Sequence, residues 1–111
     1  LGDDHPDTLT TRNNLAHAYQ SAGDLDRAIS LYEHTLTTQE RVLGDDHPDT
    51  LTTRNNLAHA YQSAGDLDRA ISLCDSTLTH CERVFGYDHP LTQTVRGNLK
   101  TLSEWRRRRA V

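Results

Sequence analysis

The sequence predicts an all-α protein, an α-solenoid in which antiparallel helix pairs stack into a single domain. Three observations predict it. Residues 1–42 and 43–84 are nearly identical, and a fixed period of about 20 to 50 residues is typical of stacked arrays. Apolar residues recur at three- and four-residue steps within each copy, as helices require. Glycine followed by aspartate divides each copy into two such segments.

The predicted domain spans residues 1–111 and contains repeat 1 (1–42), repeat 2 (43–84) and a partial third repeat (85–111) that closes the stack as a capping helix. Residue 1 is not Met and falls at a repeat boundary, so we expect a fragment of a longer protein. The two copies differ at five positions, all in the second half of the unit: Tyr32/Cys74, Glu33/Asp75, His34/Ser76, Thr38/His80 and Gln39/Cys81.

The first helix of each copy is predicted to begin at Asp4, an N-cap, with Pro6 in its first turn. Asp7 adds a carboxylate at the positive end of the helix dipole. Gly23 is expected to end the helix in the left-handed conformation. Between these signals the apolar stripe consists of Leu9, Leu15, Ala16, Tyr19 and Ala22.

Asp24 is predicted to cap the second helix, and Gly44 to end it. Leu31, Thr35 and Val42 give this helix another mildly apolar edge, as expected if it contacts both its partner and the next repeat. Its main apolar stripe consists of Leu25, Ala28, Ile29, Tyr32, Leu36 and Leu43.

The third unit departs from the pattern, since Lys100 stands where the copies have Ala16 and Ala58. We expect a solvated terminal helix whose last turn, Arg106 to Arg109, places cations at the negative end of the dipole. A small basic site for nucleic acid or acidic lipid is the alternative. A formal charge of −4 predicts no general attraction to either partner.

The composition favours neither a membrane protein nor an enzyme. No apolar run approaches the ~18 residues of a membrane span. Cys74 and Cys81 lie two helical turns apart, roughly 10 Å along the axis, too far for a disulfide. Two free thiols favour a reducing cytoplasm. The histidines and cysteines show no metal-binding spacing, and the helical serines Ser21 and Ser30 have no arranged base, so we expect no metal, cofactor or catalysis.

Residues 13–36, "NNLAHAYQSAGDLDRAISLYEHTL", resemble a tetratricopeptide repeat. The residues that carry the resemblance are Leu15, Ala16, Tyr19, Gly23, Ala28, Tyr32 and Leu36. The longer 42-residue form, with its "LGDDHP" link, is similar to kinesin light chain repeats and to repeat arrays of bacterial, often actinobacterial, signalling proteins. The resemblance implies a right-handed superhelical stack that binds protein or peptide partners without catalysis.

The resemblance also implies a concave groove lined by the first helices. Family members often hold a peptide main chain through an asparagine at the place of Asn14 and Asn56, and a carboxamide both donates and accepts. His17 and His59 would add a pH-sensitive contact. The alternative is a plain solvated helix face. The groove residues so implied are Asn13, Asn14, His17, Gln20, Ser21, Asn55, Asn56, His59, Gln62 and Ser63.

The implied row contains no lysine or arginine, because Arg12, Arg54 and Arg96 fall beside it. It therefore favours a neutral or mixed segment read through hydrogen bonds. A second hypothesis is structural self-association, because the apolar edge of the first helix has no preceding repeat to cover it. Two copies would then meet at this face as a homodimer or array.

Overall fold

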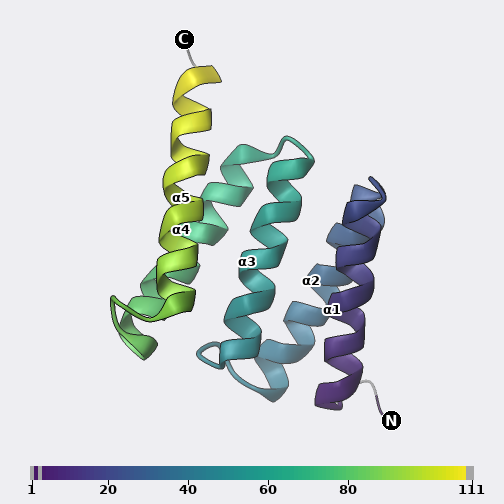
Figure 1. Cartoon of the computed structure of the whole chain (residues 1–111). Coiled ribbons are helices and arrows are strands. Elements are labelled where there is room, and N and C mark those ends of the chain that lie inside the picture. Colours follow the sequence, from purple (N-terminus) through teal and green to yellow (C-terminus); the bar gives the residue numbers. More distant parts are fainter. Residues whose placement is uncertain (1, 3, 110–111) are drawn as a thin grey trace.

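The computed structural model describes residue 2 and residues 4–109. In this part of the chain five helices and no strand occur: α1 (Pro6–Ser21), α2 (Leu25–Val42), α3 (Pro48–Ser63), α4 (Leu67–Phe85) and α5 (Pro90–Arg109). Figure 1 shows α1, α3 and α5 side by side in one layer, with α2 and α4 behind them. The predicted α-solenoid of antiparallel helix pairs is confirmed.

The first helices begin at a histidine, so the prediction of Asp4 as N-cap is wrong. The His5 Nδ1 atom accepts a hydrogen bond from the Asp7 backbone N–H at 3.1 Å, and His47 repeats this contact at 3.0 Å. Proline holds the preceding residue in extended backbone, the conformation that an N-cap needs, and His5 has φ −70° and ψ 138°. Asp4 instead pairs with Arg41, at 2.8 Å.

The turn between the two helices of a pair is the one predicted. Gly23 has φ 83°, a conformation that costs glycine little. Its N–H bonds to the Gln20 carbonyl at 3.0 Å, and the Asp24 N–H bonds to the Tyr19 carbonyl at 2.9 Å. These two bonds satisfy the last carbonyls of α1. Asp24 then caps α2 by accepting from the Arg27 N–H at 3.3 Å, which confirms this N-cap.

The core runs through the interface between the two helix layers and along the stack. Ala16, Ala28 and Tyr32 are fully buried in the first pair, and Ala58, Ala70 and Cys74 occupy the equivalent places in the second. Cys74 replaces the larger Tyr32, and its Sγ donates to the Val95 carbonyl of α5 at 3.4 Å. The helix that follows each pair thus packs against the second helix of that pair.

Candidate functional site

The first helices are joined side by side by polar contacts, in which three of the predicted groove residues take part. The Asn13 amide on α1 donates to the Thr53 hydroxyl on α3 at 2.7 Å. The Gln20 amide donates to the Ser63 hydroxyl at 3.4 Å. These contacts set the spacing of α1 and α3, so part of the predicted row stabilises the groove wall.

Asn55 is the copy of Asn13 but has a different partner. Val95 stands on α5 where α3 has Thr53, so no hydroxyl is available there. The Asn98 amide donates to the Asn55 oxygen instead, at 3.0 Å. Asn98 is itself the third-unit counterpart of Asn14 and Asn56. The carboxamide at this place in α5 is therefore engaged in joining helices.

Three hollows lie along the first-helix layer and are named here by where their lining residues fall along α3 and α5, whose lower and upper ends Figure 1 shows. The lower hollow, of about 220 Å³, is lined by Thr10, Asn13, Asn14, Gln39, Asp49, Thr52 and Asn56. The central hollow, of about 290 Å³, is lined by His17, Gln20, Tyr32, Asn55, Asn56, His59, Thr94 and Asn98. The upper hollow, of about 430 Å³, is lined by His59, Gln62, Ser63, Gly65, Trp105 and Arg109.

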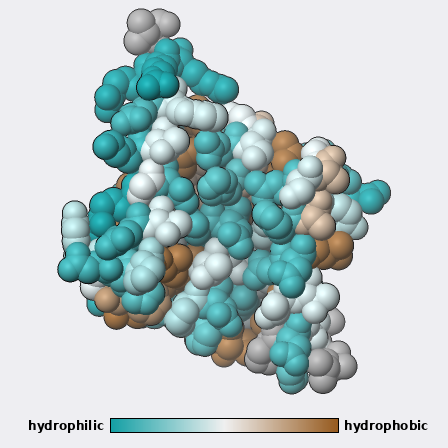
Figure 2. All heavy atoms as spheres, viewed as in Figure 1, coloured by the Kyte–Doolittle hydropathy of each residue, from teal (hydrophilic) through white to brown (hydrophobic). Residues whose placement is uncertain are grey.

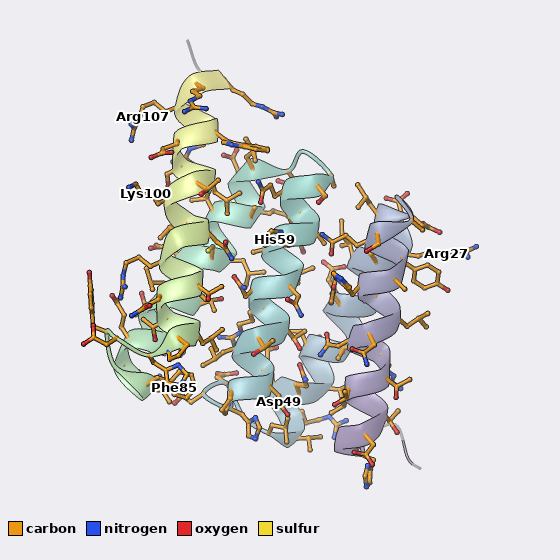
Figure 3. The ribbon with its side chains drawn as sticks, viewed as in Figure 1. Arg27, Asp49, His59, Phe85, Lys100 and Arg107 are labelled. Atoms are coloured by element: carbon orange, nitrogen blue, oxygen red, sulfur yellow. The ribbon has the colours of Figure 1, made fainter. Side chains whose placement is uncertain are left out.

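Shared residues place the three hollows next to one another in one row. Asn56 lines both the lower and the central hollow, and His59 lines both the central and the upper one. Figure 3 shows Asp49 at the lower end of α3 and His59 further up the same helix. The face is largely hydrophilic in Figure 2. Of the ten predicted groove residues, Ser21 lines none of the three hollows.

The prediction missed residues that come from outside the first helices of the two copies. Tyr32 and Gln39 belong to α2 and are fully or almost fully buried, yet they form part of the groove floor. The Tyr32 hydroxyl donates to the Gln20 oxygen at 3.4 Å. Helical periodicity marks such residues as core, and nothing in the sequence shows that they also line the groove. Trp105 and Arg109 come from the third unit.

The row is nearly uncharged between its ends. Asp49 lines the lower hollow and Arg109 the upper one. Arg54, expected beside the row, is 7% exposed and donates to Glu40 at 2.7 Å and to Asp45 at 3.3 Å. It therefore links α3 to the preceding repeat. The described chain brings together no group of three metal-binding side chains, and none of its helices could cross a membrane.

A separate hollow of about 490 Å³ lies on the outer face of the first pair and is lined by Leu15, Tyr19, Asp26, Arg27, Ser30, Leu31 and His34. Hydrophobic atoms reach this edge beside α1 in Figure 2. The second pair carries its counterpart, of about 530 Å³, lined by Leu57, Tyr61, Arg69, Ser72, Leu73 and Ser76 together with Glu33, Leu36 and Thr37. The last three residues belong to α2, which covers this face in repeat 2.

Comparison with solved structures shows the same architecture. A protein of Podosopora anserina assigned as a kinesin light chain, with nearly identical TPR-like repeats, superposes with a TM-score of 0.83 at 27% identity, covering 99% of this chain and 52% of that one. A variant of the same protein gives a TM-score of 0.85 at 25% identity, with the same coverage.

BtubC (BKLC) from P. vanneervenii superposes with a TM-score of 0.82 at 25% identity, covering 92% of this chain and 41% of that one. This chain thus spans about half the length of these three solved structures, or less. A search of curated proteins gives no significant match.

The helix pairs, their glycine turns and the kinesin-light-chain-like neighbours agree with the result of a family comparison. The tetratricopeptide repeat model matches residues 7–73 and again residues 49–108. Together these matches cover nearly all of the chain, which belongs to the tetratricopeptide repeat family.

Proposed function

We propose that the chain binds an extended polypeptide segment along the row of hollows on α1, α3 and α5. Tetratricopeptide repeat proteins generally mediate protein–protein interaction and are generally non-catalytic scaffolds. The observation that carries the proposal is the adjacency of the three hollows, since Asn56 lines the lower and central ones and His59 lines the central and upper ones. We place this binding in the cytoplasm, where the thiols of Cys74 and Cys81 stay reduced.

Two carboxamides remain for a ligand after the helix-to-helix contacts are made. Asn14 and Asn56 line the hollows, and their side chains form no hydrogen bond within the described part of the chain. A carboxamide offers a donor and an acceptor to a peptide group. Two of them, one repeat apart, would hold an extended main chain at two points.

The test uses selection of random dodecapeptides by the chain from a display library. Asn14→Ala combined with Asn56→Ala should lose capture of the selected peptides, because both main-chain contacts disappear. Circular dichroism and urea unfolding should stay unchanged, since neither amide joins helices. A control variant, Ser30→Ala with Ser72→Ala, alters the second helices and should keep binding. Undiminished capture by the asparagine variant would refute the proposal.

A second candidate function is self-association through the outer face of the first pair. Its lining residues Leu15, Tyr19, Arg27, Ser30 and Leu31 recur as Leu57, Tyr61, Arg69, Ser72 and Leu73. In repeat 2 the face is covered by a helix that presents Glu33, Leu36 and Thr37. No helix of the described chain covers this face in repeat 1, which thus offers a surface already suited to a helix of the same kind, provided by a neighbouring molecule in a homodimer or array.

The polar part of this face is equally well formed. The Tyr61 hydroxyl donates to the Glu33 carboxylate at 2.6 Å, and the Arg69 guanidinium lies 5.8 Å from the centre of the Tyr61 ring. Tyr19 and Arg27 repeat the ring contact at 5.8 Å. No carboxylate is bonded to Tyr19 in the described chain, so this pair would receive an acidic side chain from the partner.

Light scattering over a dilution series tests this candidate. We expect the average mass to rise with concentration in the wild type and to remain that of a monomer in Leu15→Lys. Leu15 is 46% exposed, so the substitution should leave the fold intact. A wild type that is monomeric at every concentration would end the self-association hypothesis and would leave the groove hypothesis untouched.

A further inference from the structure

The outer face of the first pair carries polar side chains in a regular order along α2. Asp26, Ser30 and His34 follow one another at four-residue steps, line the same hollow and are exposed. Residues four apart share one face of a helix. At a rise of about 1.5 Å per residue, Asp26 and His34 lie roughly 6 Å on either side of Ser30. The stripe thus has a carboxylate at one end, a small hydroxyl at its centre and an imidazole at the other end.

The two end groups of this stripe have no partner within the described chain. The side chains of Asp26 and His34 form no hydrogen bond or ion pair with any described residue. They lie roughly 12 Å apart along α2, too far to contact each other. Arg27 is already engaged, because it pairs with Asp24 at 3.4 Å and lies over the Tyr19 ring. Asp26 and His34 are therefore complementary groups that can meet only between two molecules.

We propose that two copies of the chain associate by laying α2 antiparallel against α2 of the second copy, with the two-fold axis at Ser30. Asp26 of each copy then pairs with His34 of the other. The inference rests on the self-association candidate and names its partner surface. A two-fold contact uses the same patch on both molecules and closes on itself, so the assembly is a homodimer and not an array.

The charges on the stripe select the antiparallel arrangement. A parallel pair of α2 helices would place Asp26 against Asp26 and His34 against His34. The antiparallel pair instead forms two contacts between unlike groups, in which an imidazole N–H donates to a carboxylate. A head-to-tail contact lacks the symmetry that makes both pairs at once. Only the antiparallel two-fold arrangement therefore satisfies both ends of both stripes.

The same axis supplies the acidic side chain that the Tyr19–Arg27 pair lacks. Arg27 lies three residues before Ser30, and Glu33 lies three residues after it. The antiparallel contact therefore brings Arg27 opposite Glu33 of the second copy. Figure 3 shows Arg27 extending from the outer edge of the first pair, away from α3. Glu33 is exposed, although its carboxylate also accepts from Tyr61.

The apolar part of the face suits a close helix contact. Packed helices lie about 8–10 Å apart, and small side chains at the crossing point give the shorter distances. Ser30 supplies a small side chain at the axis. Leu15 is 46% exposed and lines the same hollow as the half-buried Leu31. The second copy would cover both leucines, and burial of apolar surface would drive the association.

Repeat 2 lacks this device although its sequence is nearly the same. Ser76 stands at the place of His34, one of the five positions at which the copies differ. Asp68, the copy of Asp26, lies 3.5 Å from Arg106 of α5. The carboxylate is thus engaged within the chain and the imidazole is missing. The described chain therefore presents one such face, and association should stop at two copies.

The first experiment exchanges the two end groups. Each substitution acts twice across the two-fold axis, so Asp26→His and His34→Asp should each weaken dimerisation about tenfold, as measured by sedimentation equilibrium at pH 7. Asp26→His combined with His34→Asp restores the pair in reverse order and should return the dimer Kd to within about threefold of the wild type. Ser76→Asp, at the matching place in repeat 2, is the control and should leave the Kd unchanged. Circular dichroism shows whether each variant is folded.

The second experiment locates the axis. Ser30→Cys places two thiols opposite each other in the dimer, where Cα atoms within roughly 7 Å allow a disulfide. Oxidised glutathione should therefore convert this variant to a covalent dimer on a non-reducing gel. Ser72→Cys, at the matching exposed place on α4, should remain monomeric. Cys74 and Cys81 are fully buried and should not contribute to cross-linking.

The outcomes separate this inference from the proposals on which it depends. We expect the mass of the wild type to rise to twice 12.5 kDa and no further. Larger assemblies, no recovery in the exchange variant, or equal cross-linking of Ser72→Cys would overturn the antiparallel dimer and leave self-association standing. A wild type that is monomeric at every concentration would overturn both, while the groove proposal would stand.

Discussion

Helices α1 and α3 have the same sixteen-residue sequence, yet they occupy different environments. Leu15 in α1 is 46% exposed, whereas its copy Leu57 in α3 is 4% exposed. Ala18 is exposed, while Ala60 is fully buried. The difference arises because α2 packs on the outer face of α3, and no described helix packs on that face of α1. Burial in this fold is therefore a property of the neighbour, and sequence alone does not assign it.

Polar residues differ in the same way. Thr11 is exposed on α1, while its copy Thr53 is fully buried on α3 and accepts the Asn13 hydrogen bond. The same threonine is solvated in one copy and part of a helix-to-helix contact in the other. Identical substitutions in the two copies should consequently have unequal effects, and the predictions below test this from the largest expected difference to the smallest.

The largest difference is expected for leucine truncation. Leu57→Ala removes a side chain packed between α3 and the preceding repeat and should lower the free energy of unfolding by about 2–5 kcal/mol. Leu15→Ala removes a half-exposed side chain and should change it by about 0.5 kcal/mol or less. Urea unfolding followed by circular dichroism measures both. Equal losses would show that α1 and α3 are equivalently packed in solution.

Removal of a hydroxyl should give an intermediate difference. Tyr61→Phe deletes the charge-assisted hydrogen bond to Glu33 and should cost about 1–2 kcal/mol. Tyr19→Phe deletes no such bond within the described chain and should be nearly neutral. The same unfolding measurement applies, and Glu33→Gln provides a control that keeps an acceptor but removes the charge. A Tyr19→Phe loss as large as that of Tyr61→Phe would contradict the comparison.

Tyr61 should also be recognisable by its titration. Burial, followed by the hydrogen bond to Glu33, raises the pKa of Tyr61 to about 12. A pKa raised in the folded state contributes stability that is complete below the ordinary tyrosine pKa near 10 and is lost as the pH rises through the folded value. Burial also raises the pKa of Tyr32, so ultraviolet titration of tyrosinate in Tyr61→Phe should lose a transition near pH 12 and keep that of Tyr32. Loss of a lower transition in that variant would contradict the assignment.

The smallest difference concerns the surface ion pairs at the links. Asp4 contacts Arg41 at 2.8 Å, whereas Asp46 contacts both Arg83 at 2.7 Å and His80 at 3.0 Å. The hydrogen bond from Arg41 lowers the pKa of Asp4, and those from Arg83 and then His80 lower that of Asp46. Lowered carboxyl pKa values contribute stability above the unfolded value near 3.9 that is lost as the pH falls through the folded one.

His80→Thr restores the residue that repeat 1 has at this place and should raise the pKa of Asp46 while leaving that of Asp4 unchanged. Carboxyl ¹³C shifts followed from neutral to acidic pH report both groups in one sample. Because both carboxylates are exposed, we expect the substitution to alter unfolding only slightly. An unchanged Asp46 titration would show that His80 makes no contact with it in solution.

The free thiols give a further test that is confined to repeat 2. Burial raises the pKa of Cys74 to about 11 and also raises that of Cys81. Since the thiolate is the reactive form, neither thiol should react with iodoacetamide at neutral pH until the protein unfolds. Unfolding in urea should release both at once. Rapid modification of the native protein would show that α4 is not covered as the structure describes.

The sequence by itself determined the period, the number of helices and most of their ends. Gly23 and Asp24 act on residues next to them in the chain, so their roles can be read locally. The histidine caps were missed although their signal is also local, because a proline forces the preceding residue into the N-cap conformation. Aspartate is the commoner cap, and Asp4 lies one residue too early.

Only the tertiary structure decided which copy of each residue is buried and which amides a ligand can reach. Asn13 and Thr53 are forty residues apart in the chain but form a hydrogen bond in the fold. Gln39 of α2 lines the lower hollow only because residues of α1 and α3 surround the same space. The copies are the same in sequence, so no local rule distinguishes Leu15 from Leu57. What distinguishes them is the free energy of packing against a helix from another repeat, and that depends on which helices are neighbours in space.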